Sequence, residues 1–311
     1  MTEYRYSYGE KLNISPSVLA LGFFDGVHIG HRELLRRAKR RAEELGILFG
    51  IFTFESDSKI KQGIKRLYKD DTKAKLFSQI GADFVIFADF ESVSGLSPEQ
   101  FVADVLVGTF KVRCAVCGYN YRFGTRASAS ATDLDMLMRA HGAESIICDR
   151  FEWGGDAVST TRIRELMKEG NIKEANTLLG APYSIFETVK RGNGVGHSLG
   201  YPTVNIPSPK PFLLRRGVYA SAVNVGGKLY KALSNVGTCP TFPEREEHVE
   251  TYILDFDRDL YGENITVYLL DFIRDEKQFS SEKELIMQIN VDKNAVLDRI
   301  GDFLWEQIGL K

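Results

Sequence analysis

The sequence has 311 residues, 40 Lys and Arg against 42 Asp and Glu, a net charge of −2 and 43% hydrophobic residues. This length exceeds what one hydrophobic core usually supports, so we expect two domains. The balanced charges exclude a disordered chain and a protein that coats nucleic acid. No apolar run approaches the roughly 20 residues that span a bilayer, and the opening MTEYRYSYGE lacks a signal-peptide pattern. We therefore expect a cytoplasmic protein that binds small molecules, without a nucleic-acid or membrane partner.

The four cysteines are too few to form a disulfide framework in a chain of this length. Cys114 and Cys117 form a CxxC pair, but they lie in the strand-like run KVRCAVCGY. Cys148 and Cys239 are too far from this pair to complete a zinc pattern. The sequence predicts buried thiols rather than redox or metal chemistry.

The first half of the chain alternates short apolar runs with amphipathic segments. Apolar runs at 18–23, 47–54, 84–88 and 114–118 predict buried strands, and the spacing of apolar residues over 31–45 predicts a helix. Strands that alternate with helices predict a parallel sheet covered on both faces. Ligands of such sheets bind at the carboxyl ends of the strands.

The second half has a different pattern, which begins after Pro182. Short β-rich segments such as TVNIP, GVYASAVNV, HVETYILDF and NITVYLLDF are separated by Gly, Asn and Pro, which predicts an antiparallel barrel. Ser281 and Glu284 have the spacing of a capping box and predict the start of a C-terminal helix.

The boundary between the two halves is predicted near residue 184. A helix ending at Leu179 and Gly180 precedes it, because glycine commonly terminates helices. The expected domains are therefore 1–183, an α/β domain, and 184–311, a β-barrel domain with a C-terminal helix.

The segment GFFDGVHIGH, Gly22 to His31, lies between the first predicted strand and helix. Its spacing fits neither GxGxxG nor GxxxxGK[ST], so neither dinucleotide binding nor a P-loop is favoured. His28 and His31 flank the start of the helix, where free N–H groups and the helix dipole favour an anion. Two imidazoles there can donate hydrogen bonds to a triphosphate. The alternative is a pair of satisfied surface histidines beside a tight turn.

The segment STTRIR places Arg162 and Arg164 in the first turn of a helix that runs to Leu179. Positive charge there interacts unfavourably with the helix dipole and destabilises the helix by a few tenths to about 1 kcal/mol. An anionic ligand would offset this cost. The alternative is that Glu165 and Glu169 pair with these arginines.

The segment RGNGVGHSLGYPTVNIP contains several glycines but is a poor dinucleotide loop, because Pro202 and an extended segment follow it instead of a helix. The glycines fit a flap over a ligand better. In the extended run, Thr203 and Asn205 point to the same face. Two neutral oxygen ligands so placed suit Mg²⁺ held beside ATP phosphates, although Thr and Asn at a strand edge also serve purely structural roles.

Two sets of motifs resemble one protein family over nearly the whole chain. GFFDGVHIGH, GYNYRFG and STTRIR resemble the FAD synthetase module of bacterial bifunctional riboflavin kinases, a member of the nucleotidylyltransferase superfamily. The Gly-rich segment with YPTVNI, and then GVYAS, LSNVGTCPTF, VETYILDFDRDLYG and FIRDEKQF, resemble riboflavin kinase in order. The resemblance implies a Rossmann-like domain followed by a β-barrel kinase domain. It also implies ATP and Mg²⁺ as requirements, and riboflavin, FMN and FAD as substrates and products.

The resemblance assigns roles to particular residues. His28 and His31 would stabilise the nucleotide phosphates, Asn120 would contact nucleotide or flavin, and Glu250 would accept the proton of the ribityl hydroxyl, which needs a positioned base to become a good nucleophile. Thr203 and Asn205 would hold Mg²⁺. The positions implied to bind ATP or phosphate are Gly22, Asp25, Gly26, Gly30, Ser159, Thr160, Arg162, Gly192, Gly194 and Gly196.

The chain departs from the family pattern at several positions. FESDSK, residues 54–59, replaces a segment with Pro and His; His197 and Cys239 each stand where relatives commonly have Arg, and Ala181 replaces the Arg of LGRPY. Two alternatives to the bifunctional enzyme therefore remain. One is a monofunctional riboflavin kinase with a degenerate first domain, and the other is a flavin-binding regulator without turnover.

Overall fold

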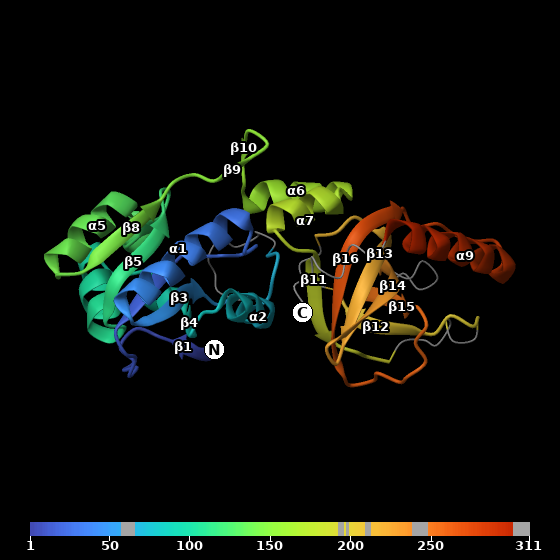
Figure 1. Ribbon diagram of the computed structural model, residues 1–311, viewed down its shortest axis with the longest axis horizontal. Coiled ribbons are helices and arrows are strands. Elements are labelled where there is room, and N and C mark those ends of the chain that lie inside the picture. The colour runs from blue at the N-terminus through green and yellow to red at the C-terminus, as the bar shows by residue number, and fades with distance from the viewer. Residues whose placement is uncertain (57–65, 192–195, 197–198, 209–212, 238–247, 301–311) are drawn as a thin grey trace. The chain divides into compact units, whose positions relative to one another are not determined.

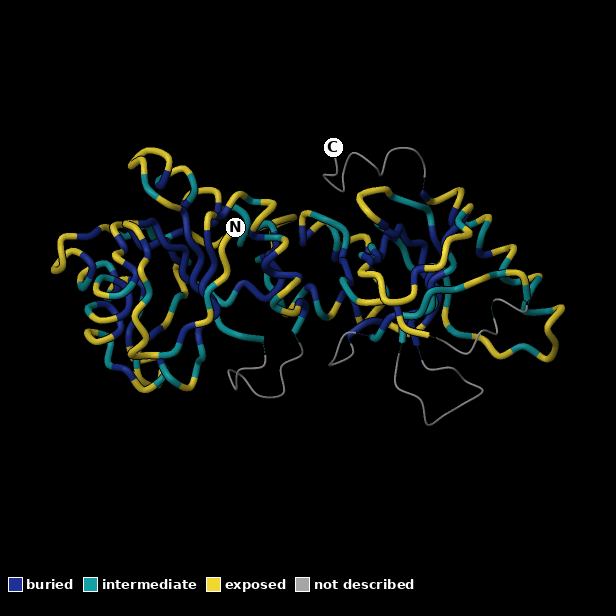
Figure 2. The backbone as a smooth tube through the Cα atoms, turned by 90° about the horizontal axis from the view of Figure 1, so that it is seen from below, coloured by how far each residue is buried: buried dark blue, intermediate teal, exposed yellow. Residues whose placement is uncertain are grey.

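The computed structural model describes residues 1–56, 66–191, 196, 199–208, 213–237 and 248–300. The chain divides into two compact units, Met1–Ser159 and Thr160–Lys311 (Figure 1). Each unit has its own buried interior (Figure 2). Among the helices of the described residues, none is long and apolar enough to cross a membrane.

The first unit is built on a parallel sheet, as the sequence predicts, and this sheet has six strands. Across the sheet the strands follow the order β1-β4-β3-β2-β5-β8. Their bounds are β1 (Thr2–Tyr6), β2 (Ser17–Leu21), β3 (Leu48–Phe54), β4 (Phe84–Ala88), β5 (Val112–Gly118) and β8 (Glu144–Cys148). Both edge strands, β1 and β8, are missing from the sequence-based prediction. The polar run MTEYRY of β1 shows little apolar alternation.

The first unit also contains helical segments. They are α1 (Ile29–Leu45), α2 (Asp70–Ile80), α3 (Phe90–Val93), α4 (Pro98–Gln100), the π-helical η1 (Phe101–Thr109) and α5 (Ala131–Ala140). Short elements complete the unit: β6 (Arg122–Phe123), η2 (Thr125–Ala127), β7 (Ala129–Ser130), β9 (Glu152–Trp153) and β10 (Asp156–Ala157).

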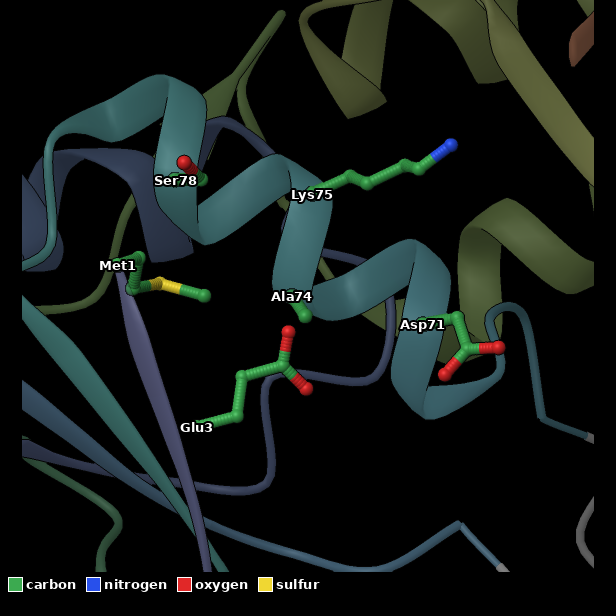
Figure 3. A pocket seen from close by; sticks show the side chains of 6 residues that line it. All are labelled: Met1, Glu3, Asp71, Ala74, Lys75 and Ser78. Carbon is green, nitrogen blue, oxygen red and sulfur yellow. The ribbon is translucent and has the colours of Figure 1, made fainter.

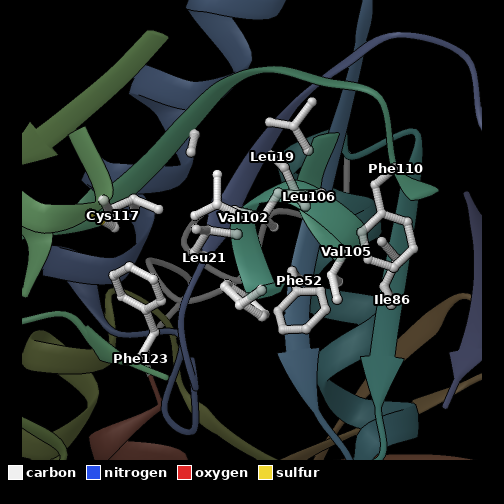
Figure 4. Close-up of a cluster of buried hydrophobic side chains, with 14 of the residues drawn as sticks. Leu19, Leu21, Phe52, Ile86, Val102, Val105, Leu106, Phe110, Cys117 and Phe123 are labelled. Carbon is white, nitrogen blue, oxygen red and sulfur yellow. The ribbon is translucent and has the colours of Figure 1, made fainter. Parts of the chain in front are cut away.

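Alternate residues of β2 enter two different cores, because a strand sends successive side chains to opposite faces. Val18 and Ala20 pack in the cluster that includes residues of α1. Leu19 and Leu21 pack in the other cluster, with residues of η1 (Figure 4). The sheet is therefore covered on both faces, which leaves the ends of its strands for a ligand.

The cysteines of β5 confirm the expectation of buried thiols. Cys114 and Cys117 belong to opposite cores of the sheet, so their side chains do not meet. Burial raises the pKa of each thiol to about 12, which keeps both protonated and poorly reactive near neutral pH. Cys148 is also buried and free, and Cys239 lies outside the described residues.

The second unit contains a curled antiparallel half-barrel and a C-terminal helix. The strands follow the order β11-β16-β13-β14-β15-β12. Their bounds are β11 (Tyr183–Thr188), β12 (Thr203–Pro207), β13 (Gly217–Val225), β14 (Lys228–Gly237), β15 (His248–Ile253) and β16 (Asn264–Arg274). The Lys190 amide, just after β11, donates to the Asn205 carbonyl of β12 at 2.8 Å, so the two edge strands meet where the sheet curls.

Two helices precede the half-barrel where the sequence predicts a single helix ending at Leu179. They are α6 (Thr160–Glu169) and α7 (Ile172–Leu179). Gly170 separates them, because its φ of +84° is left-handed and ends α6. The Asn176 amide ties α7 to the sheet: it donates to the Leu269 carbonyl at 2.9 Å and accepts from the Tyr183 amide at 2.8 Å. The two helices therefore group with the second unit.

The C-terminal helix α9 (Glu282–Arg299) begins where the sequence predicts. The Ser281 hydroxyl accepts from the Glu284 amide at 3.2 Å. The Glu284 carboxylate accepts from the Ser280 amide at 3.0 Å, one residue earlier than in a standard capping box.

Candidate functional site

The loop between β2 and α1 is held in a strained conformation. Phe24 and Val27 have φ of +47° and +43°, which non-glycine residues rarely adopt. A Cβ atom on Gly22 would lie 2.7 Å from the buried Phe24 ring, and one on Gly30 would lie 3.1 Å from Cβ of Phe151. Strain of this kind persists only where the surrounding structure enforces it, and it clusters at functional sites. The loop lies at the carboxyl end of β2, where a ligand of a parallel sheet is expected.

His28 and His31 form one stacked pair at the N-terminus of α1. The His28 Nδ1 accepts a hydrogen bond from the His31 amide at 3.2 Å and caps the helix. The two imidazole rings stack with centroids 3.5 Å apart and planes inclined by 15°. The edge-on Phe24 ring lies 5.3 Å from the His31 ring. The structure therefore brings these two predicted residues together at one point.

Burial keeps both imidazoles neutral near pH 7. It lowers the pKa of His28 to about 4. Burial also lowers the pKa of His31 well below its ordinary value, and the charges of His28 and Lys73 lower it further. Because Nδ1 of His28 accepts a hydrogen bond, its proton lies on Nε2. Among the described residues, the buried Nδ1 of His31 has no hydrogen-bond partner.

Asp25 and Asn120 lie at the same edge of the sheet as the histidine pair. The buried Asp25 carboxylate accepts from the Leu67 amide at 2.9 Å and fixes the loop to the segment before α2. Asn120 is exposed and follows β5, the neighbour of β2. A Cβ atom on Gly118 would lie 3.3 Å from its side-chain oxygen. Neither position was distinguishable from an ordinary loop residue without the resemblance.

Three further residues predicted to bind phosphate, Ser159, Thr160 and Arg162, lie at the boundary between the two units. Ser159 ends the first unit, and Thr160 is the first residue of α6 in the second. The Arg162 guanidinium forms an ion pair with Glu174 of α7 at 2.9 Å. Its role at the phosphates stays a prediction.

In the second unit, β12 and β15 present the predicted kinase residues on one face of the sheet. Asn205 lies directly opposite Glu250, and Thr203 lies opposite Tyr252. Residues directly opposite in an antiparallel pair point to the same side. Along β15, Val249, Thr251 and Ile253 are buried while the residues between them are only partly buried. Thr203, Asn205 and Glu250 therefore share the more accessible face.

The end of the Gly-rich segment packs against this face. A Cβ atom on Gly196 would lie 2.5 Å from the Tyr201 carbonyl oxygen and 3.1 Å from the Thr203 hydroxyl, so only glycine fits. The Tyr201 amide donates to the Gly196 carbonyl at 2.8 Å, and its hydroxyl donates to Asn290 of α9 at 3.0 Å. Gly192 and Gly194, which belong to the same prediction, lie outside the described residues.

Two neighbours of Glu250 were missed by sequence reasoning. His248 Nε2 lies 3.2 Å from the Glu250 carboxylate, two residues earlier on β15. Asn235 lies opposite Glu250 on β14, so the carboxylate has an amide side chain on each side. The alternating pattern of HVETYI could have placed His248 on the same face as Glu250. No sequence signal sets the register of β14 against β15.

A separate pocket lies between β1 and α2 (Figure 3). It contains none of the predicted site residues. Its lining residues are Met1, Glu3, Asp71, Ala74, Lys75 and Ser78.

Comparisons with known proteins match both units. A family described as FAD synthetase matches residues 10–162, and a family described as riboflavin kinase matches residues 179–300. The bifunctional riboflavin kinase/FMN adenylyltransferase of Listeria monocytogenes is 35% identical, over 89% of this chain and 90% of that protein. The protein of the same name from Bacillus subtilis is 31% identical, over 90% and 92%. A crystal structure described as a macrolide-efflux protein from Streptococcus pneumoniae has a TM-score of 0.84 and 30% identity, and covers 95% of this chain and 99% of that one. The chain therefore belongs to the bifunctional riboflavin kinase/FMN adenylyltransferase family.

Proposed function

We propose that this chain phosphorylates riboflavin to FMN in its second unit and adenylylates FMN to FAD in its first. The observation that carries the proposal is that each unit gathers its own group of reactive side chains. The histidine pair caps α1 in the first unit, and Asn205 faces Glu250 in the second. Membership of the family supports the same two reactions.

In the kinase reaction, the ribityl hydroxyl oxygen attacks the γ-phosphorus of ATP, and ADP leaves. Glu250 accepts the hydroxyl proton, because a carboxylate in hydrogen-bond reach is a suitable general base. His248, at 3.2 Å from that carboxylate, limits the directions in which it can point. The absence of a side chain on Gly196 lets the backbone there pass close to the Thr203 hydroxyl.

The side chains on this face of the sheet are suited to bind the Mg²⁺ that the kinase reaction requires. Thr203 and Asn205 offer neutral oxygens on the face that carries the Glu250 carboxylate. Magnesium prefers oxygen ligands, takes few from protein and completes its shell with water and substrate phosphates. Bound Mg²⁺ supplies charge neutralisation at the ATP phosphates. We place both reactions in the cytoplasm, where ATP is available and a reducing medium keeps the thiols reduced.

In the adenylylation reaction, a phosphate oxygen of FMN attacks the α-phosphorus of ATP, and pyrophosphate leaves. Negative charge develops on the phosphates, and donors fixed at a helix N-terminus stabilise it. His28 donates through Nε2 as a neutral imidazole, because burial lowers its pKa to about 4. The strained loop with Gly22 and Gly30 holds this donor in place before ATP binds.

The test is an incubation of purified protein with riboflavin, ATP and Mg²⁺, with flavins and nucleotides separated by chromatography. The proposal expects FMN with ADP, followed by FAD with pyrophosphate. FMN without FAD would indicate the monofunctional kinase. Riboflavin bound without either product would indicate the regulator.

A further inference from the structure

Lys73 of α2 is a buried cation near Phe23, in the loop that leads to the histidine pair. It is 1% exposed, and among the described residues it is one of the largest fully buried side chains. Lysine is almost never buried to this degree without a partner of opposite charge. Here its ammonium donates to two neutral oxygens, the Thr53 hydroxyl at 2.9 Å and the Phe54 carbonyl at 3.3 Å.

Lys73 is connected to the strained loop through Thr53. The Thr53 hydroxyl donates to the Phe23 carbonyl at 2.9 Å, so a short chain of hydrogen bonds runs from α2 through β3 to the loop. The ammonium also lies 5.2 Å from the Phe23 ring centroid and 5.5 Å from that of Phe87. Groups of β3, β4 and the loop therefore surround this one charge of α2.

The charged groups around Lys73 come from several elements. Asp70 of α2 and Asp25 of the loop favour its charge, while Arg66, Arg5 of β1 and burial oppose it. Burial dominates and lowers the pKa of Lys73 to about 8. In the other direction, the charge of Lys73 lowers the pKa of His31.

We propose that Lys73 is a positioning residue for adenylylation, whose buried charge supports phosphate binding at the histidine pair. The charge acts in two ways: it holds the loop through Thr53, and it adds positive potential where an anion binds. A buried, poorly solvated cation lowers the stability of the fold. Proteins keep such unfavourable groups mainly at functional sites. This inference rests on the proposed adenylylation in the first unit.

The test compares Lys73→Met, which keeps the unbranched shape and removes the charge, with Lys75→Met as a control. Lys75 is an exposed lysine of the same helix that lines the pocket of Figure 3. We expect Lys73→Met to lower kcat/KM for ATP in FAD formation by about tenfold or more, below the effect of removing a direct donor. FMN formation should be unchanged in both variants. The melting temperature of Lys73→Met should equal or exceed that of the wild type, because a buried charge has been removed.

The dependence of FAD formation on pH distinguishes a role of the Lys73 charge from a role of its packing. In the wild type, kcat/KM for ATP in FAD formation should fall as pH rises through about 8, where Lys73 loses its proton. The residual activity of Lys73→Met should lack this fall. A fall of the same size and midpoint in Lys73→Met would assign it to another group and would contradict the role of the charge.

A second pair of variants tests the connection to the loop. Thr53→Val removes the hydroxyl that joins Lys73 to Phe23, and Thr53→Ser keeps it. We expect Thr53→Val to reproduce the loss of FAD formation and Thr53→Ser to retain the wild-type rate. Equal rates in the two variants would contradict the connection.

Binding of pyrophosphate with Mg²⁺ to the full-length chain, measured by calorimetry, gives a readout that needs no turnover. Weaker binding in Lys73→Met than in Lys75→Met supports the proposal. If wild-type protein makes no FAD, the adenylylation proposal fails. The pyrophosphate affinities of the variants would then still test whether Lys73 supports phosphate binding. Unchanged pyrophosphate affinity together with unchanged FAD formation in Lys73→Met would refute it.

Discussion

Asn205 and Glu250 lie directly opposite each other on β12 and β15 of the second unit. Asn235 of β14 lies on the other side of Glu250 in the same register. The residues to which the family resemblance assigns metal binding and the base, 45 positions apart, are thus cross-strand neighbours on one face.

This arrangement predicts a defect in metal use when the oxygen ligands are removed. Thr203→Ala and Asn205→Ala should raise the Mg²⁺ concentration needed for half-maximal FMN formation, because each removes one proposed ligand and leaves Glu250 in place. Titration of activity with Mg²⁺ at fixed ATP measures this. Thr188→Ala on β11 is the control, because the exposed Thr188 bonds only to Asn264 among the described residues. Unchanged titrations in both site variants would remove them from the metal site.

The buried His28 predicts a loss of stability in acid. Its pKa is about 4 in the folded protein and near 6.5 when unfolded, so the unfolded chain binds more protons between these values. Stability from this group is therefore fully present above about pH 6.5 and is lost as pH falls towards 4. From pH 7 to 4.5 we expect a loss of about 2 kcal/mol from this residue.

Urea unfolding at the two pH values measures this loss. His28→Asn should lose less stability than the wild type in acid, because asparagine keeps the N-cap without titrating. His141→Asn, at an exposed C-cap, is the control and should behave as the wild type. Equal acid losses in His28→Asn and the wild type would show that His28 is not held neutral.

Much of the fold could be predicted from periodicity, and the exceptions have physical causes. The run at 84–88 coincides with β4, because five consecutive apolar residues bounded by polar ones indicate a buried strand. The break at Gly170 was missed, because one glycine inside an amphipathic pattern is often tolerated.

Some features of the two candidate sites could likewise be predicted from the sequence, and others could not. The position of His28 and His31 at a helix start followed from local sequence, whereas no local signal distinguished Lys73 from the neighbouring Lys75. The burial of Lys73 depends on where α2 packs against β3 and the loop, which local sequence does not specify. His248 and Asn235 became neighbours of Glu250 only through strand register.

The second unit should function as a separate fragment, and its starting point matters. A fragment of residues 184–311 should phosphorylate riboflavin, because the half-barrel and α9 carry the proposed kinase residues. A fragment of residues 160–311 should unfold at a higher temperature, since it retains α7 and the Asn176 hydrogen bonds to Tyr183 and Leu269. Circular dichroism and FMN formation measure the two properties. A folded 160–311 fragment without kinase activity would contradict a self-contained kinase unit.

The central claim is that two separate sites perform the two reactions, and one crossed measurement tests it most directly. Glu250→Gln and His31→Ala are each assayed for FMN from riboflavin and for FAD from supplied FMN, beside Glu263→Gln and His141→Ala as exposed controls. Glu250→Gln should lose FMN formation by about a hundredfold or more and keep FAD formation. His31→Ala should lose FAD formation by about a hundredfold to a thousandfold and keep FMN formation. Loss of both activities in either variant, with the fold intact by circular dichroism, or loss of neither, would contradict the account.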